Sequence, residues 1–237
     1  MSLHHVIDGE GSPLVLASSL GTTHRLWEPN LAALHSRFRV VRYDHPGHGE
    51  SPPGPNTVEG LARAALGLLD GLGLGRVTFC GLSLGGMVAI WLGAHASERI
   101  ERLVLSSTAP RLPPAEQWHE RAAAVRREGM AAVADAVVGR WFTPRFAGDR
   151  EPWRTMLVST PPEGYARCCE AIAAMDLRSE LRAIRVPITV IVGRHDPVID
   201  VENRRLLGKA GPVVELDAAH LANVEQPKAF VEAVLAG

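Results

Sequence analysis

Residues Gly81-Leu82-Ser83-Leu84-Gly85 follow the pattern G-x-S-x-G, which places a serine hydroxyl in a tight turn between two glycines. The motif comes directly after an apolar run, Val77–Cys80, and opens a stretch of helical character, Leu84–His95. In a strand–turn–helix of this kind the hydroxyl is exposed, and N–H groups at the helix start face a developing anion. The context therefore favours Ser83 as the nucleophile of acyl transfer over an ordinary glycine-rich turn.

A serine nucleophile needs a base and an acid, which follow it in the chain order serine, acid, histidine for this type of turn. Asp196 comes just after the apolar run Ile188–Val192, and His220 comes just after the run Val213–Leu216. Ligand-binding residues of open parallel sheets lie on such loops, at the carboxyl ends of the strands. We therefore predict His220 as the general base and Asp196 as the acid that orients it.

Other residues near these loops offer alternatives. Asp200 and Asp217 are acids in the same region, but Asp196 lies closest to a strand end. A surface turn is the alternative interpretation of Asp196 itself. His195 stands beside the acid but precedes it, so the chain order disfavours it as the base.

Two N–H groups are needed to hold the oxyanion of a tetrahedral intermediate. One is expected from Leu84, the residue after the nucleophile. The other is expected from the loop Ser18–Gly21, which follows the apolar run Pro13–Ala17. We assign it to Leu20.

The remaining histidines do not form a recognisable ligand pattern. His45 and His48 lie in a Pro/Gly-rich turn without a third ligand at typical spacing, so they are interpreted as loop structure. His4 and His5 are interpreted as exposed strand residues. We predict no metal site and no cofactor.

The elements that must position these residues alternate along the chain. Strands are expected at 13–17, 38–43, 77–80, 103–106, 188–192 and 213–216, and helices at 58–72, 84–95 and 227–235. Near-continuous apolar strands between helices indicate an α/β fold with a mostly parallel sheet that helices flank on both faces.

The alternation is interrupted after Ser107. From Pro113 to about Arg185 the sequence has helical spacing only, at 115–128, 129–140 and 163–175, with prolines and glycines between. We predict a helical lid over 113–185, inserted into one core domain formed by 1–112 and 186–237.

Composition excludes some partners. The chain has 237 residues and a formal net charge of −1, which argues against a nucleic-acid-binding protein. A local basic cluster on one expected helix is interpreted as a solvated face; it consists of Arg121, Arg126 and Arg127. The oligomeric state is not predicted.

Membrane association and secretion are not expected either. No segment reaches the roughly 20 apolar residues of a membrane span, and Met1–Asp8 lacks the apolar core of a secretion signal. The three cysteines, Cys80, Cys168 and Cys169, do not suggest a disulfide framework. We therefore expect a reduced, cytoplasmic location.

Three stretches of the predicted lid have a distinctive sequence: Arg140–Phe142, Gly164–Ile172 and Asp176–Arg178. With these stretches and the serine elbow, the sequence resembles the α/β-hydrolases along essentially its whole length, and within them the 3-oxoadipate enol-lactonases of the β-ketoadipate pathway. The elbow and the triad order are shared by the whole superfamily, whereas several lid stretches are specific to the enol-lactonases. Pro46 departs from the pattern, because many relatives have arginine before Gly-His-Gly.

The resemblance implies a carboxylic-ester hydrolase that opens 3-oxoadipate enol-lactone through an acyl-enzyme, without a cofactor. A small anionic lactone needs a cation, for which Arg140 in the lid is the first candidate. Trp141 is expected to line the pocket, with Trp27 as a weaker candidate. The alternatives are another carboxylesterase or lactonase, and a non-catalytic ligand-binding protein of the same fold.

Overall fold

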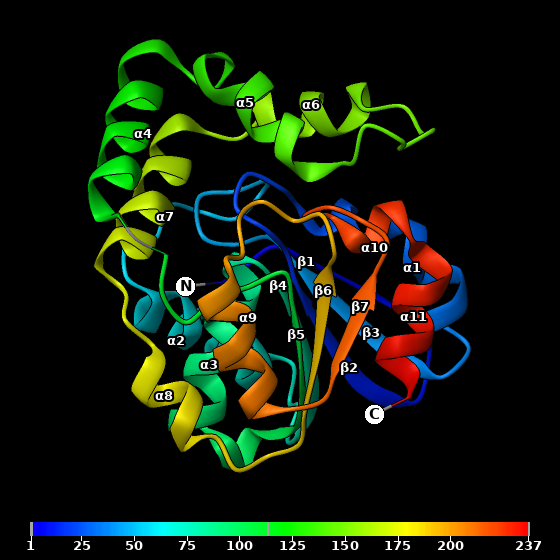
Figure 1. The fold of residues 1–237 in the computed structure, drawn as a ribbon. Coiled ribbons are helices and arrows are strands. Elements are labelled where there is room, and N and C mark those ends of the chain that lie inside the picture. The colour runs from blue at the N-terminus through cyan, green and yellow to red at the C-terminus, as the bar shows by residue number, and fades with distance from the viewer. Residues whose placement is uncertain (1, 113, 237) are drawn as a thin grey trace.

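The computed structural model describes residues 2–112 and 114–236, and in them a seven-stranded sheet has the order β1-β3-β2-β4-β5-β6-β7 (Figure 1). β1 pairs with β3 antiparallel, and the other pairs are parallel. The strands are β1 (His5–Asp8), β2 (Ser12–Ala17), β3 (Phe38–Tyr43), β4 (Val77–Leu82), β5 (Ile100–Ser106), β6 (Ile188–Gly193) and β7 (Val213–Leu216).

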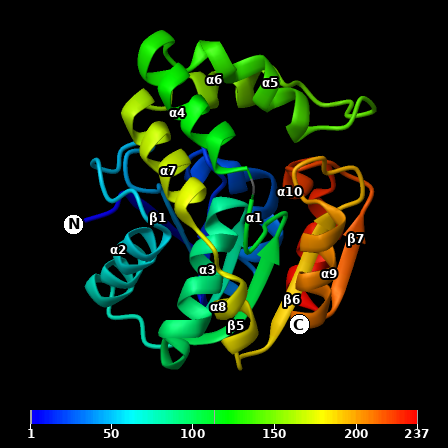
Figure 2. The same ribbon diagram turned by 60° about the vertical axis from the view of Figure 1, so that its left-hand side comes forward.

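Helices cover both faces of this sheet, which explains why β4 is buried along its whole length. One face carries α2 (Val58–Gly71), α3 (Leu84–His95), α8 (Arg178–Ala183) and α9 (Val201–Ala210) (Figure 2). The other face carries α1 (Glu28–Leu34), α10 (Ala222–Glu225) and α11 (Pro227–Leu235). The structure also has two short 3₁₀ helices, η1 (His24–Trp27) and η2 (Ser97–Arg99).

A layer of helices lies across the carboxyl edge of the sheet (Figure 1). It consists of α4 (Ala115–Glu128), α5 (Ala131–Trp141), α6 (Glu151–Val158) and α7 (Pro162–Ala174). We refer to α4–α7 as the lid helices. Of the predicted insertion 113–185, Pro113 lies outside the described residues, and α8 packs against the core helices α3 and α9 rather than over the edge.

The observed elements agree with the expected α/β class, but some have weak sequence signals. β1 is a short edge strand with β3 as its one partner, so it does not need the continuous apolar run of a central strand. His4 precedes β1 and His5 is its first residue, and both are partly buried rather than exposed. Among the described residues, no helix is both long enough and apolar enough to span a membrane.

Candidate active site

Ser83 stands in a strained turn between β4 and α3. Its φ of 56° lies in the region that side chains disfavour. A side-chain carbon on Gly81 would overlap the carbonyl oxygen of Gly85, and one on Gly85 would overlap the carbonyl oxygen of Ala17. The flanking glycines therefore permit the close approach of β2, β4 and α3 that forces the serine out of the turn.

His220 and Asp196 meet on two neighbouring loops after β7 and β6. The His220 Nδ1–H donates a hydrogen bond of 2.8 Å to Asp196 Oδ2, and Asp196 Oδ1 accepts one of 2.8 Å from the Val198 N–H. Both side chains are buried, and Ser83 and His220 line the same cavity. The structure thus brings together the three residues that were predicted as a triad.

The alternative acids are engaged elsewhere. Asp217 is exposed and pairs with His195 at 2.7 Å and with Arg145 at 3.1 Å. Asp200 caps α9 by accepting a hydrogen bond from the Asn203 N–H at 2.8 Å. His195 therefore belongs to a surface ion pair.

The loop that carries Leu20 is anchored by two buried histidines after β3. The His45 Nε2–H donates to Ser18 O at 2.9 Å, and His48 Nε2 accepts from the Gly21 N–H at 3.0 Å. Burial lowers the pKa of each imidazole to about 4, so both rings are neutral near pH 7. The two residues form part of a loop, as interpreted from the sequence, and they also position a second loop.

The N–H groups assigned to the oxyanion remain available. Within the described part of the chain, neither the Leu20 N–H nor the Leu84 N–H donates a hydrogen bond. Gly85 N–H, one residue further along, donates to Ser18 O at 3.1 Å and so joins the two segments. The start of α3 and the loop of Leu20 therefore flank the serine from adjacent backbone segments.

A cavity of about 210 Å³ lies between Ser83 and the lid helices. Arg140 and Trp141 from the end of α5 line it, as predicted, and so does Leu20. The Trp141 carbonyl accepts a hydrogen bond of 3.0 Å from the Leu221 N–H, beside His220. The end of α5 is thus tied to the loop that carries His220.

Trp27 does not line this cavity, and its assignment to the pocket was wrong. Its side chain is fully buried, donates from Nε1 to Ser18 Oγ at 3.1 Å and packs on Phe230 at a ring-centroid distance of 5.9 Å. The ring fills the core beneath the Ser18 loop because η1 turns it inward toward α11. It therefore supports the loop from below.

The interpretation of the basic cluster as a solvated face was wrong for Arg121. It lines the cavity with Arg140, and its guanidinium lies 4.5 Å from the centre of the Trp118 ring. Arg126 instead pairs with Glu163 and Glu170 between α4 and α7. Helical spacing places Arg121 on a different side of α4 from Arg126.

The two cavity arginines differ from other arginines of the same region. Arg154, Arg167 and Arg178 all form ion pairs. Within residues 2–112 and 114–236, Arg121 and Arg140 form none. Burial and the positive charge of Arg121 lower the pKa of Arg140 below its ordinary value. An anion in the cavity would relieve this repulsion.

A mostly parallel sheet with a serine elbow after β4, an aspartate after β6 and a histidine after β7 defines the class of the α/β-hydrolases. A family model described as "Alpha/beta hydrolase family" matches residues 14–233, and the chain belongs to this family. The predicted fold is thus confirmed.

Within the family, similarity to enol-lactonases is extensive. The chain is 38% identical over 230 residues to 3-oxoadipate enol-lactonase 2 of Acinetobacter baylyi, covering 93% of this chain and 86% of the relative. The crystal structure of the enol-lactonase from Burkholderia xenovorans LB400 is 46% identical, with a TM-score of 0.93 and coverage of 99% and 95%. A putative carbamate hydrolase RutD of a Caulobacter species is 29% identical, covering 98% and 94%.

Proposed function

We propose that the chain is a serine hydrolase that opens 3-oxoadipate enol-lactone to 3-oxoadipate in the β-ketoadipate pathway. The observation that carries this proposal is the pair of cavity arginines, Arg121 and Arg140, beside Ser83. Two cations without an ion-pair partner in the described structure suit a small ligand with a carboxylate. The similarity to named enol-lactonases supports the same substrate.

In the proposed reaction, Ser83 Oγ attacks the lactone carbonyl while His220 Nε2 takes its proton. Asp196 holds the imidazole through Nδ1–H and stabilises the imidazolium. The N–H groups of Leu20 and Leu84 stabilise the oxyanion. The ring C–O bond then breaks, and the leaving enol oxygen takes the proton from His220.

The product remains attached to Ser83 as an ester whose enol tautomerises to a ketone. His220 then removes a proton from water, and the resulting hydroxide attacks the ester carbonyl. The bond from the acyl carbon to Ser83 Oγ breaks, and Ser83 Oγ takes the proton from His220. Trp141 bounds the cavity on the lid side. We place the reaction in the cytoplasm, because the three cysteines are buried and free.

The proposal is tested by kcat/KM for freshly generated 3-oxoadipate enol-lactone and for neutral p-nitrophenyl acetate. A charge-assisted hydrogen bond contributes about 1.5–3 kcal/mol, and each ~1.4 kcal/mol is tenfold in rate. Arg140→Ala and Arg121→Ala should each lower the lactone value by about ten- to a hundredfold and barely change the ester value. Arg154→Ala, in the surface pair with Asp135, is the control.

Equal losses for both substrates would assign the arginines a structural role. A wild-type enzyme that ignores the lactone but cleaves neutral esters would identify another carboxylesterase. If an activated ester gives no burst of acyl-enzyme, a non-catalytic ligand-binding role would replace the proposal.

A further inference from the structure

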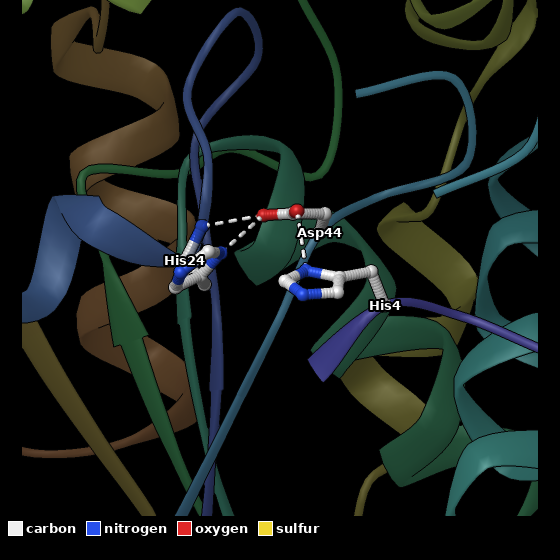
Figure 3. A group of neighbouring side chains, drawn as sticks. All are labelled: His4, His24 and Asp44. Carbon is white, nitrogen blue, oxygen red and sulfur yellow. Dashed lines mark hydrogen bonds and ion pairs between the residues drawn. The ribbon is translucent and has the colours of Figure 1, made fainter. Parts of the chain in front are cut away.

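A second group of polar side chains lies outside the active site, where three segments of the core meet. His4 comes from the chain just before β1, His24 from the start of η1, and Asp44 from the end of β3 (Figure 3). His4 Nδ1 is 2.9 Å from Asp44 Oδ2, and His24 Nδ1 is 3.0 Å from Asp44 Oδ1. Both rings therefore turn the same type of nitrogen toward one carboxylate.

The backbone holds this arrangement in place. Asp44 accepts hydrogen bonds from the N–H groups of His24 at 2.7 Å and Glu50 at 3.2 Å. The His4 N–H donates to Ser51 Oγ at 2.9 Å, and the His4 carbonyl accepts from the Asp44 N–H at 3.0 Å. Because only N–H donors face the buried Asp44 oxygens, this side chain is an ionised carboxylate.

The distances fit a tetrahedral cation. The three ligand atoms lie within 4.8 Å of one another. A zinc ion with bonds of about 2.0–2.1 Å to nitrogen and oxygen separates its ligand atoms by about 3.3 Å. The nitrogen–oxygen distances of 2.9 and 3.0 Å are near that value, but they involve Asp44 Oδ2 and Oδ1 respectively. An ion would therefore bind both carboxylate oxygens, or the side chains would rotate so that one oxygen faces both nitrogens.

We propose that His4, His24 and Asp44 bind a divalent transition metal ion of the zinc type. Two imidazoles and one carboxylate are ligands typical of such ions, and they leave a fourth position open. To bind an ion through Nδ1, a neutral imidazole carries its proton on Nε2. The net charge of the three side chains and the ion becomes +1.

Glu50 supplies a separate feature of a metal site. Its Oε1 lies 3.7 Å from His4 Nε2, the nitrogen that gains the proton when Nδ1 binds the ion. A carboxylate that accepts from the outer N–H of a ligating histidine orients the ring and raises its basicity. At 3.7 Å the Glu50 carboxylate is too far from His4 Nε2 for a hydrogen bond, so a rotation of its exposed side chain would be needed to make this contact.

The open position has an approach from solvent. His24, Asp44 and Glu50 line a cavity of about 420 Å³ that is separate from the cavity of Ser83. Trp153 and Met156 of α6 form its opposite wall. An ion there would lie between the core and a lid helix.

The test uses untagged full-length protein that has been stripped with a chelator and exchanged into metal-free buffer. Co²⁺ is titrated and followed by its visible d–d absorption, and Zn²⁺ affinity is measured by competition with a chromophoric chelator. We expect one saturable site per chain with a tetrahedral Co²⁺ spectrum. His4→Ala and His24→Ala should each weaken Zn²⁺ binding by at least about tenfold, because outer-shell changes alone cost that much.

His5→Ala and His119→Ala are matched controls, since His5 is adjacent in sequence and His119 is an exposed histidine of α4. Both should bind as wild type does, and Zn²⁺ should raise the Tm of the wild type and the controls only. Absence of saturable binding to the wild type, or equal losses in the controls, would overturn the proposal. Circular dichroism of each variant separates lost binding from lost fold.

Discussion

Asp196 and Asp217 each accept a hydrogen bond from a histidine, but burial separates the two pairs. The Asp196 side chain is 1% exposed and its partner His220 lines the cavity of Ser83, whereas the Asp217 side chain is 52% exposed. A buried carboxylate holds its histidine in one tautomer, while an exposed pair is screened by water. At the scale of single residues, burial therefore distinguishes the two acids.

Asp196→Asn should lower kcat by about 10³–10⁴-fold, because the amide stabilises the wrong tautomer of His220. Ser83→Ala sets the background rate of the assay. Asp217→Asn, at the surface pair, should stay within about twofold of wild type. Esterase kinetics with an activated ester measure all three, and a severe loss in Asp217→Asn with a mild one in Asp196→Asn would exchange the roles of the two acids.

At the scale of elements, the loop after β3 controls the loop after β2. His48 accepts from the Gly21 N–H, next to Leu20, and His45 donates to Ser18 O. α6 also restricts this loop, because a side chain on Gly21 would overlap the side chain of Leu157. The position of the Leu20 N–H thus depends on side chains from two other segments.

His48→Ala removes the acceptor of the Gly21 N–H and should lower kcat by about tenfold or more, with a smaller change in KM. A misplaced oxyanion donor affects the transition state more than the bound substrate. His48→Gln places an amide oxygen near the former Nε2 and should recover most of the rate. Steady-state kinetics measure both parameters. A raised KM with an unchanged kcat would show that the loop binds substrate instead.

The lid helix α7 meets the core at a contact between two glycines. Gly164 lies so close to Gly47 that a side-chain carbon on Gly164 would overlap the Gly47 carbonyl oxygen. Gly47 has a φ of 74°, which favours glycine for a second reason. α7 therefore packs directly on the loop of His45 and His48.

Gly164→Ala should destabilise the protein by about 1–3 kcal/mol, because overpacking moves α7 away from the loop. Gly139→Ala is the control, since the exposed Gly139 of α5 has no heavy atom within 4 Å of an added carbon. The control should be neutral or raise stability by up to about 1 kcal/mol. Urea unfolding measures both free energies, and equal effects of the two substitutions would contradict the close contact between Gly164 and Gly47.

At the scale of the whole molecule, two buried neutral histidines make folding sensitive to acid. The pKa values of His45 and His48 are lowered to about 4, chiefly by burial, from an ordinary value of 6.5. Between pH 6.5 and 4 the unfolded chain binds more protons than the folded one, so stability falls as the pH falls. Protonated His48 would also lose its acceptor for the Gly21 N–H.

The free energy of unfolding should therefore decrease by up to about 1.4 kcal/mol per pH unit and per histidine in this window. His48→Gln keeps an acceptor but does not titrate, so its stability should depend less steeply on pH. Urea unfolding at pH 7.5, 6 and 5 provides the comparison. If the free energy of unfolding depends on pH equally steeply in the wild type and in His48→Gln, His48 is not a source of the acid sensitivity.

The sequence by itself determined the elbow, the chain order of the predicted triad and the α/β class. These features depend on short motifs and on apolar periodicity, which neighbouring residues specify. Ser83, Asp196 and His220 each follow a strand end, so topology alone predicts that they share one edge of the sheet.

The tertiary structure decided which side chains face a cavity. Arg121, Trp27 and the cluster of His4, His24 and Asp44 show this, since their environments come from segments that are distant in the chain. A one-residue rotation of α4 or η1 would turn a different side chain inward, because successive residues lie about 100° apart in an α-helix and about 120° apart in a 3₁₀ helix. Packing against the core selects one of these rotations, and packing depends on contacts that no local pattern contains.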